Sequence, residues 1–185
     1  MVHPVNEFAS ARSAWESFYV IVGSSGGALI GLQFVVMTLI ADKRHRTTAD
    51  TLSAFGTPTV VHLAGALLVS AIMSAPWPSL FPASVALGMC GLGGLAYGTV
   101  GIRRARRQTT YTPVWQDWVW YALLPCSVYA ALALSAAFLR TNTQSGLFVI
   151  AAAALGLLLI GIHNAWDTVT HIVVSNSLGD QTRTD

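Results

Sequence analysis

The residues best suited to chemistry lie in one stretch near the end of the chain. His163, Asp167 and His171 stand four residues apart, so on a helix they project from one face. Asn164 follows His163 directly. A carboxylate between two imidazoles can hold both rings in one tautomer and can bind a proton, a cation or a small polar ligand. This spacing marks a candidate polar site.

Two more polar residues interrupt otherwise apolar stretches. His62 lies near the beginning of one stretch, and Gln33 lies in the second half of another. Ionisable side chains inside membrane segments are rare and often functional. Helices that meet on one side of a membrane could bring His62 near His163 or Asp167, and Gln33 could join them. Two plainer alternatives stay open: a His62 that only hydrogen-bonds a neighbouring helix, and an Asp167 that is hydrated beyond the hydrocarbon.

A metal or a haem is a minor alternative for the same side chains. His163 and His171 would lie about 12 Å apart on a straight helix, so they cannot share one ion. A Zn²⁺ site would need one of them together with Asp167 and His62. A bis-histidine haem would need His62 opposite His163. We expect no resident cofactor, and neither the order nor the depth of the residues indicates a catalytic triad.

The composition requires that the elements holding these residues lie in lipid. Hydrophobic residues make up 54% of the chain and charged residues only 10%, whereas a soluble domain carries about a quarter charged residues. The apolar residues form five segments that are long enough to cross a bilayer as helices and lack the short alternation of barrel strands. These spans cover about 15–40, 58–75, 82–102, 118–139 and 146–174.

We therefore predict an all-α polytopic membrane protein, a five-helix transmembrane bundle that forms one domain over residues 1–185. The second span has an alternative start at Asp50, which would act as its N-cap and leave Pro58 inside the helix as a kink.

The basic residues predict how the spans are oriented. Seven of the ten Lys and Arg residues follow the first and third spans, and they are Lys43, Arg44, Arg46, Arg103, Arg104, Arg106 and Arg107. Loops rich in Lys and Arg stay in the cytoplasm, so the N-terminus is expected outside and the C-terminus inside. The four arginines at 103–107 are expected to contact anionic lipid and not nucleic acid.

Aromatic residues gather where the spans should reach the membrane surface. Trp115, Trp118, Trp120 and Tyr121 stand at the beginning of the fourth span, and Trp15 begins the first. Trp and Tyr favour this depth because one end of each side chain is apolar and the other is polar. We interpret these residues as interfacial anchors.

Small residues recur at steps of three and four in two spans. The first span holds Gly23, Gly27 and Gly31, and the third holds Gly91, Gly94, Gly98 and Gly101. Such a series forms a groove in which two helix backbones approach closely. The partner helix could belong to the same chain or to a second copy.

Four short stretches resemble a group of small bacterial integral membrane proteins that has no assigned activity. They are Gly23–Leu39, Pro58–His62, Ser74–Trp77 and His163–Asp167. The resemblance implies five helices in a bacterial inner membrane. It makes His62, His163 and Asp167 residues worth testing and gives them no role.

The sequence supports three hypotheses of function. The first is a homo-oligomeric channel or transport-type protein in which His62, His163, Asp167 and Gln33 line a narrow path and histidine protonation tunes passage. The second is an accessory membrane protein that binds a partner complex. The third is a haem-binding or metal-binding redox protein.

Overall fold

The computed structural model describes residues 13–42, 49–107, 115–139 and 141–181, and within these ranges the chain forms helices and turns and no strand. The helices are α2 (Glu16–Asp42), α3 (Ala49–Ser74), α4 (Leu80–Arg107), α5 (Trp115–Trp118), η1 (Val119–Leu123), α6 (Leu124–Phe138) and α7 (Thr143–Gln181).

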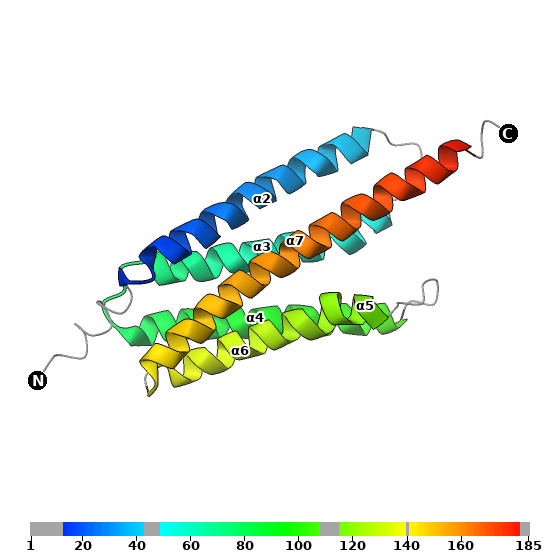
Figure 1. Cartoon of the computed structure of the whole chain (residues 1–185). Helices are drawn as coiled ribbons and strands as arrows, with labels where there is room; N and C mark the ends of the chain where they lie inside the picture. Colours follow the sequence, from blue (N-terminus) through cyan, green and yellow to red (C-terminus); the bar gives the residue numbers. More distant parts are fainter. Residues whose placement is uncertain (1–12, 43–48, 108–114, 140, 182–185) are drawn as a thin grey trace, which may run out of the picture.

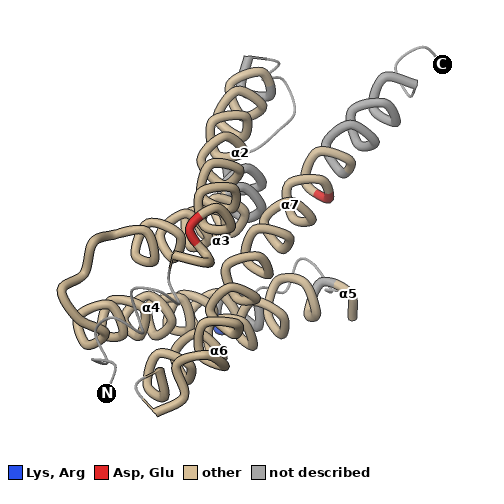
Figure 2. Tube along the Cα trace, turned by 60° about the vertical axis from the view of Figure 1, so that its left-hand side comes forward, with Lys and Arg blue, Asp and Glu red and all other residues tan. Residues whose placement is uncertain are grey.

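Five helical segments in the described part of the chain are long and apolar enough to cross a membrane. They cover Glu16–Leu39, Thr57–Ser74, Leu80–Arg103, Val119–Phe138 and Thr143–Thr170. The predicted all-α class and five span-length helices are thereby confirmed. Helix α3 begins at Ala49 with Pro58 inside it, close to the alternative start of the second span. Charged residues are few among those that Figure 2 colours by type.

Helix α7 connects two helix pairs. Helices α2 and α3 run side by side, as do α4 and α6, and α7 packs against both α3 and α6 (Figure 1). The chain reverses direction between successive span-length helices. Helices α2, α4 and α7 therefore begin at the end of the bundle where α3 and α6 end (Figure 1). We call the end where α2 begins the Trp15 end, and the end that holds α5 and η1 the Asp167 end.

The Trp15 end is closed by packed apolar side chains. Trp15 contacts Phe148 of α7 edge to face, with ring centroids 4.8 Å apart. Trp77 donates a hydrogen bond of 2.6 Å from Nε1 to the carbonyl oxygen of Ile72 in the last turn of α3, and the same oxygen also accepts from the backbone N–H of Ala75. The side chains buried in this half include Tyr19, Val22, Val69, Met73, Leu147 and Ile150.

Glycines of α4 allow α6 to lie directly on its backbone. A Cβ atom on Gly91 would lie 2.7 Å from the backbone nitrogen of Ala133. The ring of Tyr129 covers Gly94, and a Cβ atom on Gly98 would lie 2.9 Å from a cysteine sulfur of α6. Three of the four glycines predicted as a packing face of α4 therefore meet a helix of the same chain, and Gly101 has nothing within 4 Å.

The glycines of α2 divide between two faces. A Cβ atom on Gly23 would lie 3.0 Å from the Cβ atom of Ser70, and one on Gly26 would lie 3.2 Å from a backbone carbonyl oxygen of α3. Gly27 and Gly31 have nothing within 4 Å. The contact with α3 thus uses Gly23 and Gly26, and the other two predicted positions face away from it.

Candidate functional site

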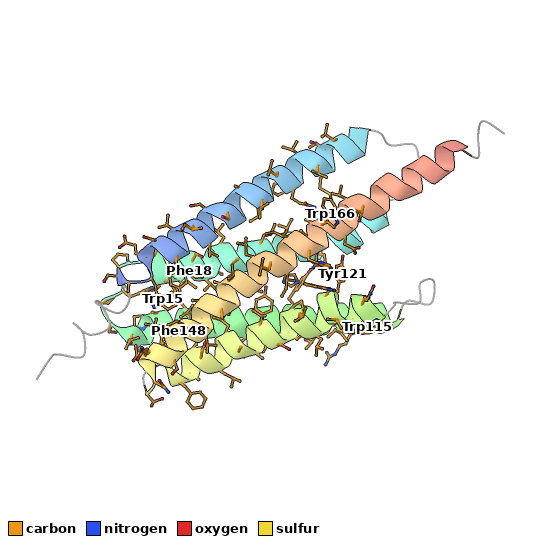
Figure 3. The ribbon with its side chains drawn as sticks, in the orientation of Figure 1. Trp15, Phe18, Trp115, Tyr121, Phe148 and Trp166 are labelled. Atoms are coloured by element: carbon orange, nitrogen blue, oxygen red, sulfur yellow. The ribbon has the colours of Figure 1, made fainter. Side chains whose placement is uncertain are left out.

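One ring contact and one hydrogen bond join η1 to α7 at the Asp167 end. The rings of Trp120 and His163 stack with their centroids 3.6 Å apart and their planes 17° from parallel. One turn along α7, Asp167 accepts a 3.0 Å hydrogen bond at Oδ2 from the hydroxyl of Tyr121. Figure 3 shows Tyr121 in the space between α5 and α7. The two contacts fix the imidazole and the carboxylate in place.

These side chains border a pocket of about 350 Å³. We call it the aromatic–acidic pocket, and it is lined by Trp115, Gln116, Val119, Trp120, Tyr121, His163 and Asp167. Pockets for small molecules have volumes from roughly 300 Å³ upward and combine apolar walls with a few polar groups. The volume of this pocket lies at the lower end of that range, and its lining combines aromatic and polar side chains.

A proline explains why Trp120 and Tyr121 face α7. Pro125 has no N–H to donate, and its ring would clash with the carbonyl of Tyr121 in a regular α-helix. The backbone responds with the single π-helical turn η1, in which the N–H of Leu124 donates to the carbonyl oxygen of Val119, five residues back. Such turns change the direction of side chains and are frequent at functional sites. Here the widened turn lies at the pocket wall.

His62 has a partner outside this pocket. Its side chain is 2% exposed, and its Nδ1 atom lies 3.3 Å from the hydroxyl oxygen of Tyr129 on α6. Of the residues predicted to meet, His163 and Asp167 share the pocket, whereas the structure pairs His62 with Tyr129. That pairing matches the simpler alternative, a buried histidine that hydrogen-bonds a neighbouring helix.

Asn164 and Gln33 lie in the interior. Asn164 is fully buried and Gln33 is 5% exposed. Neither atom of the Asn164 carboxamide, nor the amide nitrogen of Gln33, has a hydrogen-bond partner among the described residues. Each unpartnered buried polar group costs about 1–3 kcal/mol. Asn164 therefore faces inward behind the pocket, while its neighbour His163 forms part of the wall.

Two close contacts place the two carboxamides in the same half of the bundle. Gly26 and Gly161 both pack on Leu63, so these residues of α2, α7 and α3 share one level. Gln33 lies seven residues beyond Gly26, and Asn164 three residues beyond Gly161, toward the Asp167 end. Seven residues make almost two full helical turns, so Gln33 lies on the same side of α2 as Gly26.

Several predicted residues lie at the edge of the described structure. His171 belongs to α7, and Arg104, Arg106 and Arg107 belong to α4, but their side chains lie outside the described residues. Arg103 is exposed at the Asp167 end of the bundle. Lys43, Arg44 and Arg46 lie outside the described residues.

Trp120 and Tyr121 were predicted as interfacial anchors and not as parts of a site. The available signal was the position of Trp120 five residues and of Tyr121 four residues before Pro125, because a proline at that distance disturbs the turn that carries them. Which helix the disturbed turn would face depends on the register between helices, and no spacing within one helix reports that register.

A second hollow lies between α4 and α6. It has a volume of about 560 Å³, and its lining includes Phe81, Val85, Leu92 and Leu134. Apart from Ser84, its lining residues are apolar or glycine. This surface lacks the charge and the hydrogen-bonding groups of the aromatic–acidic pocket.

No protein-family model, curated protein or solved structure matches this chain. Among the described residues, no three His, Cys, Asp or Glu side chains gather closely enough to hold a metal ion. The site must be interpreted from its own residues.

Proposed function

We propose that this chain is a transport-type protein of a bacterial cytoplasmic membrane and that it handles protons or a small cation at the aromatic–acidic pocket. The observation that carries the proposal is the contact of Trp120 and Tyr121 with His163 and Asp167 at the end of two span-length helices. The contact places a carboxylate and an imidazole side by side in a pocket. Both groups can exchange protons, and the carboxylate attracts cations.

The proposed orientation places this pocket at the cytoplasmic face. Arg103 and the other arginines of α4 lie at the Asp167 end, and so do the end of α2 and the beginning of α3, which flank three basic residues in the sequence. Loops rich in Lys and Arg stay in the cytoplasm. Residues of the pocket would then meet cytoplasmic water, and the Trp15 end would face the outside.

A continuous path would have to form between copies of the chain. The Trp15 half of a single copy is filled by buried apolar side chains such as Val22, Met73 and Ile150. A second copy could pack on α2, where Gly27 and Gly31 have nothing within 4 Å and would permit close approach of another helix. The protein that we propose for transport is therefore a homo-oligomer.

Proton flux into liposomes tests the proposal. Purified protein is reconstituted around a trapped pH-sensitive dye, and a pH step is applied with potassium and valinomycin present to compensate charge. We expect wild-type protein to speed the collapse of the gradient and Asp167→Asn to return the rate to that of protein-free liposomes, because the variant has no carboxylate to hold the proton or cation.

Glu16→Gln is the matched control for this experiment. It neutralises another exposed carboxylate, in the first turn of α2 at the Trp15 end, and should keep the wild-type rate. A wild-type rate no faster than that of empty liposomes, or equal rates for Asp167→Asn and wild type, would overturn the proposal.

The closed apolar half also favours a second candidate, an accessory membrane protein that binds at the pocket and transports nothing. Val22, Met73 and Ile150 fill the space a path through one copy would need. In that case the flux experiment fails for every variant, and purification in mild detergent recovers a second membrane protein in fixed ratio. The haem-binding or metal-binding hypothesis is the weakest of the three, because His62 and His163 contact different aromatic residues.

A further inference from the structure

The charge of the aromatic–acidic pocket selects for a cation. Asp167 is exposed, and among the described residues that line the pocket it carries the only carboxylate. The hydroxyl of Tyr121 donates to one of its two oxygens and holds the group in a fixed orientation. An anionic ligand would meet this carboxylate at close range and would be repelled.

The remaining lining selects against an inorganic ion. Mg²⁺ and Ca²⁺ need six to eight oxygen ligands, whereas most of the lining consists of Trp115, Trp120, Tyr121 and His163. Aromatic rings attract cations through the negative charge of their faces, and they do so best with organic ammonium groups that carry little bound water. A carboxylate that shares a pocket with indole and phenol rings has the recognition chemistry of an ammonium site.

The dimensions of the pocket agree with this chemistry. Its volume of about 350 Å³ is far larger than one dehydrated metal ion and leaves room for an alkylammonium group with a short chain. One face of the Trp120 ring is occupied by His163. Trp115, in contrast, is 71% exposed.

We propose that the aromatic–acidic pocket binds a small organic ammonium group, with Asp167 as its counter-ion and Trp115, Trp120 and Tyr121 as its aromatic walls. This inference rests on the proposed function and names the class of cation that the site recognises. The ammonium can belong to a lipid headgroup or to a soluble amine, since both carry the same recognised group.

The position of the pocket brings both sources within reach. Trp120 is the second residue of its span-length segment, and Asp167 is the fourth residue from the end of another. In the proposed bilayer these residues lie at the depth of lipid headgroups, where Trp and Tyr are enriched. The same depth is open to solutes from water.

Tryptophan fluorescence during titration with tetramethylammonium chloride tests the inference on the full chain in mild detergent. Sodium chloride at equal concentrations provides the ionic-strength control. We expect a saturable change with tetramethylammonium and none with sodium. Asp167→Asn should weaken binding at least about tenfold and Trp115→Leu by several-fold, because they remove the counter-ion and one aromatic wall. Glu16→Gln should bind as wild type does.

Two lipid compositions distinguish the two sources. In nanodiscs of phosphatidylglycerol alone, tetramethylammonium should bind. If it also binds unchanged when phosphatidylethanolamine is included, the natural ligand is a soluble amine, and if the second lipid displaces it, the ligand is the lipid headgroup. Equal responses to sodium and tetramethylammonium, or wild-type affinity in Asp167→Asn, would overturn the inference.

The result separates this inference from the proposed function. Proton flux that depends on Asp167 without ammonium binding contradicts only the ligand class. Ammonium binding without flux contradicts only transport and leaves the binding site in place.

Discussion

Replacing Gly91 by leucine is expected to destabilise the bundle by about 3 kcal/mol, the upper part of the usual range for an overpacked core. A Cβ atom at this position would lie 2.7 Å from the backbone nitrogen of Ala133 and 2.9 Å from the carbonyl oxygen of Tyr129. Both are backbone atoms of α6, so no side chain can rotate out of the way. Helices α4 and α6 would have to separate along their contact.

Gly93→Leu is the matched control for this substitution. Gly93 lies on the same helix, two residues further on, and has nothing within 4 Å. Both substitutions replace a helical glycine by a good helix former, which is worth roughly 1 kcal/mol in each case. Thermal unfolding in detergent, followed by circular dichroism, should give a clearly lower midpoint for Gly91→Leu than for Gly93→Leu. Equal midpoints would show that α4 and α6 do not pack through Gly91.

Replacing Asn164 by leucine is expected to stabilise the protein by about 1–3 kcal/mol. The side chain is fully buried, and both polar atoms of its carboxamide lack a partner among the described residues. Leucine has the same number of side-chain heavy atoms in the same branched arrangement and no polar atom to desolvate.

Tyr129→Phe provides the opposite comparison. It removes a hydroxyl that lies 3.3 Å from Nδ1 of His62, and the loss of a buried hydrogen bond should cost about 1 kcal/mol. Thermal unfolding should therefore move the midpoint up for Asn164→Leu and down for Tyr129→Phe. A lower midpoint for Asn164→Leu would contradict this prediction, because it would mean that the Asn164 carboxamide makes a stabilising hydrogen bond in the interior of the bundle.

The five span-length helices could be predicted because hydropathy over about 20 residues depends on the local sequence alone. The predicted helix boundaries agree less closely with the structure where polar residues continue a helix beyond its apolar part. Helix α3 begins at Ala49, before the apolar stretch that starts near Pro58, and α7 continues to Gln181, beyond the predicted end at residue 174. Neither extension leaves a signal in hydropathy.

Half of the candidate site was predictable for a related reason. His163 and Asp167 are four residues apart on one helix, and helical geometry alone places them on one face. Their partners Trp120 and Tyr121 come from a turn that is widened at Pro125. The register between η1 and α7 is set by packing along several helices, so the sequence suggested His62 as a partner instead.

The glycines also show that a helix face can be predicted more easily than the residues of that face that make the contact. Gly91, Gly94 and Gly98 form the contact of α4 with α6, and regular spacing indicated that face. On α2 the spacing of four selected Gly23, Gly27 and Gly31, yet the contact with α3 uses Gly23 and Gly26. Steps of three and four are both compatible with one helix face, and only the partner helix decides between them.

The ring protons of His163 provide the most direct measurement of the contact on which the proposed site depends. Histidine-labelled protein in micelles gives resonances that can be assigned by the loss of one set in His163→Gln. Stacking on Trp120, with centroids 3.6 Å apart, predicts ring protons shifted upfield by the indole ring current. The shift should disappear in Trp120→Leu and persist in Trp115→Leu. His163 ring protons at ordinary positions in the wild-type protein would contradict the stacked site between η1 and α7.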